Sequence, residues 1–395
     1  MKEFGFLHNT WYHFQMVQNL YAADGVHVGD EATFSSYAGS ICRNSYTNST
    51  FVTVHDLSHG HFRGPRPVTF KNVPEGYYIE GSADGLGTKG ILIDAAQMHE
   101  TAGYDLLAMT ATDITRYGGL PLVLINILDL TSVGKEGDEV NTVYRKLLMG
   151  LGEAAKASNV VVLKGETAQM SVAIGSEIPN SPTRFNWGAT ITGVYHKDKM
   201  VTGDTLASGQ KVIALKEQGF RCNGISSVRK ALAMQYGPQW WSNSDATSDI
   251  KAAAAPSLLY DVFVNTIHGW YTKDFVPEMN IHAIVHLSGG GIKEKFGADL
   301  LKPRGFSAIL DNLYDPSEIM KKCAQWRGIG AEEFYETWNA GQGMLLVVDA
   351  RDADRCVARA KDFGIDAQVC GEITKNETNP TLTIHSKLFN TAVSY

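Results

Sequence analysis

Residues 76–89, GYYIEGSADGLGTK, join an apolar, strand-like segment to an acidic, glycine-rich loop. Tyrosine and isoleucine favour a strand over the first five positions. Gly85 and Gly87 permit positive φ angles and a close approach of the backbone to a ligand. Asp84 can hold a divalent cation, and Lys89 can meet a phosphate. The spacing is not that of the phosphate-binding loop GxxxxGK[ST], so on its own the stretch fits a solvated hairpin turn equally well.

Short apolar runs and amphipathic segments alternate from this loop as far as residue 195, as they do in α/β domains. Residues 101–117 have helical spacing, and residues 122–130 form the continuous apolar run of a buried strand. The pattern also predicts a helix over residues 141–157 and strands over residues 160–163 and 187–194. An α/β domain is therefore expected around the Asp84 loop.

A second domain is expected after residues 197–209, which are polar and rich in turn-forming residues. A chain of 395 residues also exceeds the length that a single core usually supports. Beyond the boundary the sequence predicts strands over residues 211–215, 282–287, 344–348 and 367–373, and helices over residues 228–234, 256–264 and 353–363. We expect an α/β (α+β) fold with two domains, residues 1–200 and 201–375, followed by a loosely held tail over residues 376–395.

Composition excludes several classes of partner. A formal net charge of −7 argues against a polyanion-binding surface, so no nucleic acid is expected. No run of about eighteen apolar residues is present, which argues against a membrane-spanning helix. The N-terminus does not have the pattern of a signal peptide. The five cysteines are scattered and odd in number, as expected of reduced thiols in a cytoplasmic protein.

Three carboxylates are candidates for one magnesium site. Asp113 lies in the largely apolar stretch 106–122, where burying an unpaired carboxylate is costly. We therefore expect Asp113 to be buried because it has a functional role. Glu166 follows a buried strand, at the kind of loop that commonly binds ligands. Together with Asp84, these oxygens predict a magnesium site for a nucleotide, in which waters and phosphates supply the other ligands.

Two further segments suit anions. Ser288-Gly289-Gly290-Gly291 lies between a predicted strand and a helix, where free backbone N–H groups favour phosphate. A glycine-rich turn without such a role fits the same pattern. Residues 219–224 have a similar placement, and Arg221 offers a planar donor with a permanent charge.

Seven segments occur in the order in which they occur in one known family. They are Asp24-Gly25-Val26, residues 84–89, Gly165-Glu166-Thr167-Ala168, Cys222-Asn223-Gly224 with Val228-Arg229-Lys230, residues 256–260, residues 286–291 and residues 338–344. The chain resembles phosphoribosylformylglycinamidine cyclo-ligase, also called aminoimidazole ribonucleotide synthetase, over about residues 21–373.

The resemblance implies a homodimer in which strands of both N-terminal domains form a shared β-barrel, with ATP in the adjoining groove and a C-terminal mixed sheet with helices. It implies an ATP- and Mg²⁺-dependent ring closure of a small ribonucleotide in purine biosynthesis. The residues it marks as catalytic are Asp84, Lys89, Asp113, Glu166 and Arg221. The nucleotide contacts it implies are Asp84, Gly85, Gly87, Thr88, Lys89, Thr167 and Asn223. It implies metal ligands at Asp84, Asp113 and Glu166. The residues it implies for the substrate phosphate are Ser288, Gly289, Gly290 and Gly291.

Departures from the family pattern leave alternatives open. Arg221 replaces a histidine, and Ala38 stands opposite a lysine linked to nucleotide binding. Residues 44–70 also depart, and Arg63 and Arg66 are candidates to restore positive charge, while His55, His59 and His61 there fit loop residues better than a metal site. The alternatives are a diverged ATP-dependent relative with another substrate and a non-catalytic nucleotide-binding paralogue. Selenophosphate synthetase is disfavoured by the setting of Cys42, and thiamine-monophosphate kinase and the hydrogenase-maturation factor by residues 338–344.

Overall fold

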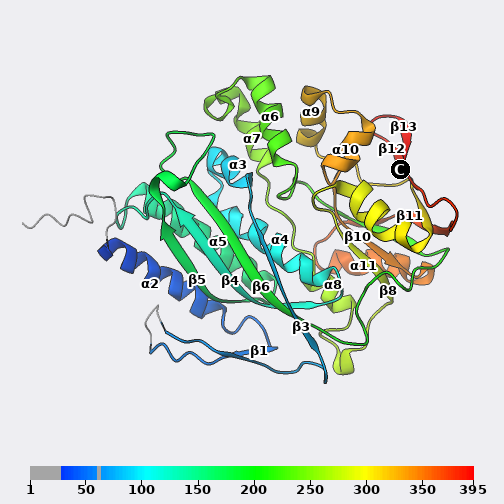
Figure 1. The fold of residues 1–395 in the computed structure, drawn as a ribbon, viewed down its shortest axis with the longest axis horizontal. Coiled ribbons are helices and arrows are strands. Elements are labelled where there is room, and N and C mark those ends of the chain that lie inside the picture. The colour runs from blue at the N-terminus through cyan, green and yellow to red at the C-terminus, as the bar shows by residue number, and fades with distance from the viewer. Residues whose placement is uncertain (1–27, 60–63) are drawn as a thin grey trace, which may run out of the picture.

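The computed structural model describes residues 28–59 and 64–395, and Figure 1 shows their arrangement. The expected motif at residues 24–26, together with His61 and Arg63, lies outside these ranges. The fold class is confirmed, because the chain forms mixed sheets covered by helices and divides into two α/β halves.

A four-stranded sheet forms the first half. In spatial order its strands are β3 (Tyr78–Gly85), β6 (Phe185–Tyr195), β4 (Leu120–Leu130) and β5 (Val161–Gln169). Only β4 and β5 run parallel; the other two pairs are antiparallel. Its helices are α2 (Val28–Ser45), α3 (Lys89–Ala96), α4 (Ala102–Thr115) and α5 (Glu139–Ala157). A short hairpin of β1 (Val52–Val54) and β2 (Val68–Phe70) lies beside them.

The core of this half lies between the sheet and helices α4 and α5. Alternate residues of β4, including Leu124 and Leu128, are fully buried there, and Trp187 of β6 joins them. Helix α5 begins where the Asp138 side chain accepts a hydrogen bond from the Asn141 amide at 2.8 Å, which satisfies an otherwise free donor. The opposite face of the sheet remains partly open, since Ile127 of β4 is 54% exposed.

A seven-stranded sheet forms the second half. In spatial order its strands are β13 (Thr391–Ser394), β12 (Leu382–Ser386), β9 (Phe306–Leu310), β11 (Ala367–Lys375), β7 (Lys211–Lys216), β10 (Gln342–Val348) and β8 (Ile281–His286). Helices α6 (Ile225–Tyr236), α7 (Thr247–Ala253), α9 (Glu318–Arg327) and α10 (Ala331–Thr337) cover one face. Helices α8 (Asp261–Ile267) and α11 (Ala353–Asp362) cover the other. Both faces are covered, so β10 is buried throughout and is apolar from Met344 to Val348.

Two predicted element boundaries are wrong. The helix predicted over residues 256–264 begins only at Asp261, because the backbone amides of Ser257 and Leu258 bond to the carboxylates of Asp105 and Glu217. The strand predicted over residues 160–163 continues to Gln169, because it stays paired with the long strand β4. Glu166 therefore lies within a strand and not in a loop.

The tail predicted to be loosely held is part of the second sheet. Strand β12 pairs with β9 in parallel and with β13 in an antiparallel hairpin. Leu382, Ile384 and Val393 are buried in the core of the second half. The prediction failed because alternating apolar residues over so short a segment resemble a polar tail.

None of the helices within residues 28–59 and 64–395 is long and apolar enough to cross a membrane.

We expect Ile384→Ala to lower the free energy of unfolding by about 2–5 kcal/mol, because it leaves a cavity in a closed core. Urea denaturation followed by circular dichroism measures the change. His385→Ala is the matched control, since His385 is exposed on the same strand. Equal stability of the two variants would show that β12 does not contribute to the fold in solution.

Candidate active site

Some of the predicted site residues lie together where the two halves meet. Asp113 lies in the last turn of α4, close to the end of β3 on one side and to the end of β8 on the other. Its Oδ2 accepts a hydrogen bond from Ser82 Oγ at 3.1 Å, and its Oδ1 lies 3.8 Å from His286 Nδ1. Neither Ser82 nor His286 was assigned a role from the sequence. The position of His286, at the end of a buried strand and just before three glycines, was the available signal.

The pKa values of the two aspartates of the site shift in opposite directions. Burial raises the pKa of Asp113, but His286, Ser82 and Arg116 outweigh this effect and hold the pKa below its usual value. The pKa of Asp84 is raised, first by desolvation and then by the negative charge of Asp113, although the Gly85 amide donates to Asp84 Oδ1 at 2.7 Å. The two carboxylates are thus close enough to repel each other.

The loop after Asp84 is open to solvent. Strand β3 ends at Gly85, and Gly87 adopts a φ of +52° in free space before helix α3 begins. Gly87 and Thr88 are exposed. The amides of Lys89 and Ile91 are bonded to the carbonyls of Leu86 and Thr88, so the exposed backbone of Gly87 and Thr88 is the part of the loop that leaves room for a phosphate.

Glu166 does not join the two aspartates within one chain. The register of the sheet places Asp84 opposite Ala189, Ala189 opposite Asn126, and Asn126 opposite Gly165. Glu166, the residue after Gly165, points to the other face of the sheet. It is separated from Asp84 by three inter-strand spacings, about 14 Å. Within the two ranges that the structure describes, no cluster of three His, Cys, Asp or Glu side chains could hold a metal ion.

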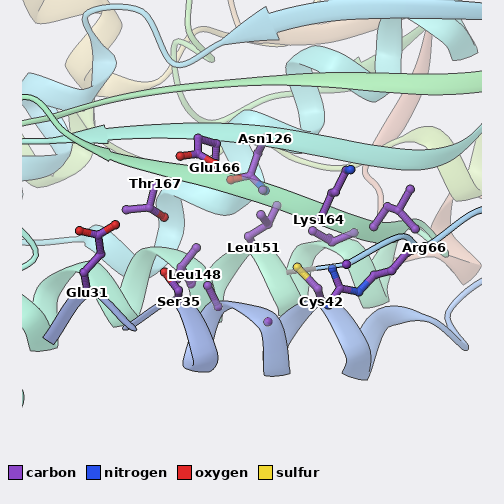
Figure 2. Close-up of a pocket in the computed structure, with 16 residues that line it drawn as sticks. Glu31, Ser35, Cys42, Arg66, Asn126, Leu148, Leu151, Lys164, Glu166 and Thr167 are labelled. Atoms are coloured by element: carbon purple, nitrogen blue, oxygen red, sulfur yellow. The ribbon is translucent and has the colours of Figure 1, made fainter. Parts of the chain in front are cut away.

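Glu166 and Thr167 instead line a cavity of about 350 Å³ between α2 and strand β5. Figure 2 shows Glu31, Ser35 and Cys42 of α2 on one side and the β5 residues on the other. Such a volume is typical of small-molecule sites. Ala38, which stands opposite the lysine of the family, lines this cavity, and Arg66 and Lys164 bring positive charge to it.

Lys89 is placed differently from the prediction. Its ammonium is fully buried, lies 2.6 Å from Asp105 Oδ1 and donates to the Ala255 carbonyl at 2.7 Å. Asp105 also accepts from the amide and the hydroxyl of Ser257, at 2.9 and 2.6 Å. Lys89 therefore joins the two halves of the chain and does not face the open loop.

Arg221 is also fully buried. Its Nη1 donates to Glu217 Oε2 at 3.0 Å and to the Leu258 carbonyl at 3.2 Å. Its Nη2 contacts the Ala108 carbonyl at 3.3 Å and His286 Nε2 at 3.4 Å. Arg221 has a φ of +55°, which a non-glycine residue adopts only when its surroundings hold it there. The guanidinium thus lies behind His286, away from an open surface.

The glycine turn at 288–291 lies beside this network. Gly290 and Gly291 have φ of +87° and +56°, and a Cβ at Gly291 would meet the Tyr335 carbonyl at 2.3 Å. Asn223 Nδ2 lies 3.9 Å from the place that a Cβ at Gly289 would take. The Asn223 Oδ1 atom is buried and has no hydrogen-bond partner among the residues described. The structure thus brings together the predicted phosphate turn and Asn223.

Comparison with known proteins assigns the chain to one family. A family model described as "AIR synthase related protein, N-terminal domain" matches residues 69–194, and one described as the C-terminal domain of the same family matches residues 207–381. A phosphoribosylformylglycinamidine cyclo-ligase of Desulfotalea psychrophila is 27% identical over 379 residues, covering 94% of this chain and 98% of the relative. One from Lachnoclostridium phytofermentans is 29% identical over 324 residues, covering 80% and 88%.

A solved structure of the hydrogenase maturation protein HypE in complex with ATP superposes with a TM-score of 0.54. It covers 82% of this chain and 86% of HypE at 14% identity, which shows a common fold.

We expect Lys89→Met to lower the free energy of unfolding by about 3–5 kcal/mol, because it leaves the Asp105 carboxylate buried without its ammonium partner. The double variant Lys89→Met/Asp105→Leu should recover much of this loss in urea denaturation. Lys156→Met is the control, since Lys156 is exposed on α5. If Lys89→Met had native stability but no longer bound nucleotide, the result would contradict the structural role and support phosphate binding by Lys89.

Proposed function

Because this chain belongs to the AIR synthase related family, we propose that it closes formylglycinamidine ribonucleotide into aminoimidazole ribonucleotide, with release of ADP and phosphate. One observation carries the proposal. The Asp113–His286 contact across the two halves sets the carboxylate pair, suited to a nucleotide and its metal, beside the glycine turn, suited to a substrate phosphate. We assign the nucleotide and the dimer contact to residues 1–200 and the ribonucleotide to residues 201–375.

The proposed reaction depends more on positioning the substrate than on general acid–base catalysis by the protein. An amide oxygen is a poor leaving group, and its phosphorylation converts it into a good one. An amidine nitrogen of the same substrate then attacks the activated carbon and closes the ring. Since both reacting groups belong to one molecule, the protein has to hold them in the reactive geometry and offset the charge that develops.

The residues present fit a nucleotide with Mg²⁺. Desolvation and, to a smaller extent, the charge of Asp113 raise the pKa of Asp84, and a cation between Asp84 and Asp113 would offset both effects. Magnesium prefers one or two carboxylates and takes its other ligands from phosphates and waters, and when bound it neutralises charge on the transferring phosphoryl group. Gly85, Gly87 and Thr88 form the loop that would receive the phosphates.

The same proposal includes a homodimer. Strand β3 has an outer edge that no strand within residues 28–59 and 64–395 pairs with, and the open face of its sheet exposes Ile79, Ile125 and Ile127 by 59, 37 and 54%. A second copy would cover both. We assign Glu166 and Thr167 to the nucleotide site of the dimer, because in one chain they lie at the opposite edge of the sheet from Asp84.

Arg221 favours a second candidate, a diverged ATP-dependent enzyme that acts on another substrate. A buried guanidinium paired with Glu217 cannot transfer protons as the histidine of the family can. The candidate shares the nucleotide site and differs only in the molecule that receives the phosphoryl group.

We expect the purified protein to release ADP only when formylglycinamidine ribonucleotide is present, with one aminoimidazole ribonucleotide formed per ADP. Asp84→Asn should lower this turnover by about 100-fold or more, because it removes a charge that holds the metal and its nucleotide. Glu75→Gln, an exposed change just before β3, is the control. ADP release with a different acceptor would support the second candidate, nucleotide binding without turnover would indicate a non-catalytic paralogue, and full activity of Asp84→Asn would contradict the metal assignment.

We expect Ile127→Asp to convert the protein from a dimer into a monomer, because it puts a charge on the apolar face that the second copy covers. Sedimentation velocity measures the change, and the affinity for Mg·ADP should fall by about tenfold or more if the second copy contributes Glu166 and Thr167. Val172→Asp is the control, since Val172 is 96% exposed outside the sheet. A native protein that sediments as a monomer would contradict the proposed dimer.

A further inference from the structure

A line of buried polar groups runs from Glu217 to the candidate metal site. Glu217 holds Arg221, Arg221 contacts His286, and His286 faces Asp113. The side chains of Glu217 and Arg221 are fully buried, and that of His286 is 1% exposed. Water therefore has little access to the two contacts of the imidazole, and the hydrogens on its two nitrogens are set by its protein neighbours.

The contact with Arg221 decides where the imidazole carries its hydrogen. A guanidinium has five N–H donors and no acceptor, so Arg221 Nη2 can only donate to His286 Nε2, across 3.4 Å. Nε2 must then present its lone pair. An imidazolium has hydrogens on both nitrogens and would face the guanidinium with a donor. The ring in this setting is neutral, and its single hydrogen lies on Nδ1.

The same hydrogen points toward the candidate metal site. Nδ1 is buried, makes no hydrogen bond to any residue described, and lies 3.8 Å from Asp113 Oδ1. Turning the ring by 180° about its Cβ–Cγ bond would set carbon atoms against Arg221 and Asp113 and leave both nitrogens without these partners. In the observed ring orientation, Nε2 therefore faces a hydrogen-bond donor and Nδ1 faces an acceptor.

We propose that Arg221 is a positioning residue that locks His286 as the Nδ1–H tautomer and aims this donor at the Asp113 carboxylate. Arg221 is itself held by Glu217 and by the carbonyls of Leu258 and Ala108, so its guanidinium has little freedom to turn away. The Asp113 carboxylate then accepts a hydrogen bond from Ser82 on Oδ2 and faces the Nδ1 donor of His286 across 3.8 Å on Oδ1. The tautomer stands independently of the proposed function, whereas its role in holding Asp113 for a nucleotide rests on that function.

Nitrogen NMR of protein labelled with ¹⁵N in the histidine rings tests the tautomer directly. The resonance pair that disappears in His286→Asn belongs to His286. We expect its Nε2 signal in the range of an unprotonated ring nitrogen and its Nδ1 signal in that of a protonated one. Arg221→Lys should keep this pattern, since lysine also only donates, and Arg221→Gln/Glu217→Gln, which removes both buried charges together, should lose it. A hydrogen on Nε2 in the native protein, alone or in a mixture, overturns the proposal.

Two substitutions of His286 test its role at Asp113. The amide nitrogen of asparagine takes the place of Nδ1, and that of glutamine the place of Nε2. We expect His286→Gln to bind Mg·ADP about tenfold or more weakly than His286→Asn, by titration calorimetry. Equal losses, or the reverse order, would overturn the role at Asp113. If the native protein bound no Mg·ADP, the proposed function would fail, and the NMR experiment would still decide the tautomer.

Discussion

Buried charges at the junction of the two halves constrain everything else at the candidate site. Lys89 with Asp105, and Arg221 with Glu217, each place a cation and an anion where water is excluded. Removing one member of such a pair leaves a charge whose desolvation is not compensated, at a cost of several kcal/mol, about 3–5 in typical cases. Each pair lies within one half and contacts the other half through a backbone carbonyl, Lys89 through that of Ala255 and Arg221 through that of Ala108. Helix α4 carries Asp105 and the carbonyl of Ala108 that meet them, and so its last turn delivers Asp113 to the end of β8.

The register of the first sheet is the second constraint. In a strand successive side chains point to opposite faces, so one position decides whether a residue reaches the helices or the open face. Asp84 and Ser82 fall on the face of α4, where Ser82 meets Asp113, whereas Glu166 falls on the other face and at the other edge. The sheet thus has an open apolar face, an outer edge that no strand among the described residues pairs with, and a carboxylate separated from the two aspartates. A second copy of the chain would resolve all three.

Much of the fold could be predicted from periodicity, because long elements such as α4, α5 and β4 carry many apolar residues in a regular pattern. Where the prediction is wrong, contacts between residues distant in the sequence are the cause. The local sequence around Ser257 is typical of a helix start, but the Ser257 amide donates to Asp105 and the helix begins later. Asp113 is conspicuous in the sequence as a carboxylate in an apolar stretch, and Asp84 as the carboxylate of a glycine-rich loop. The surroundings predicted for Lys89 and Arg221 are wrong, since no local pattern shows that a cation will be buried against an anion of its own half and a carbonyl of the other half. Ser82 was missed because a serine on a strand has no local signature of function.

Arg221 also limits how protons can move during the proposed reaction. With Nε2 of His286 facing a guanidinium, the imidazole cannot accept a proton there, and its Nδ1–H can only donate toward Asp113. The proton released by the attacking amidine nitrogen must therefore leave by another route. Asp84 is the carboxylate at the site whose pKa is raised, but a bound cation would lower that pKa and remove its basicity. The phosphate that departs from the activated amide is a base already in place beside the new bond. A site that positions its substrate and leaves proton transfer to the leaving group needs no histidine where Arg221 stands, and can use a fixed cation there to hold its geometry.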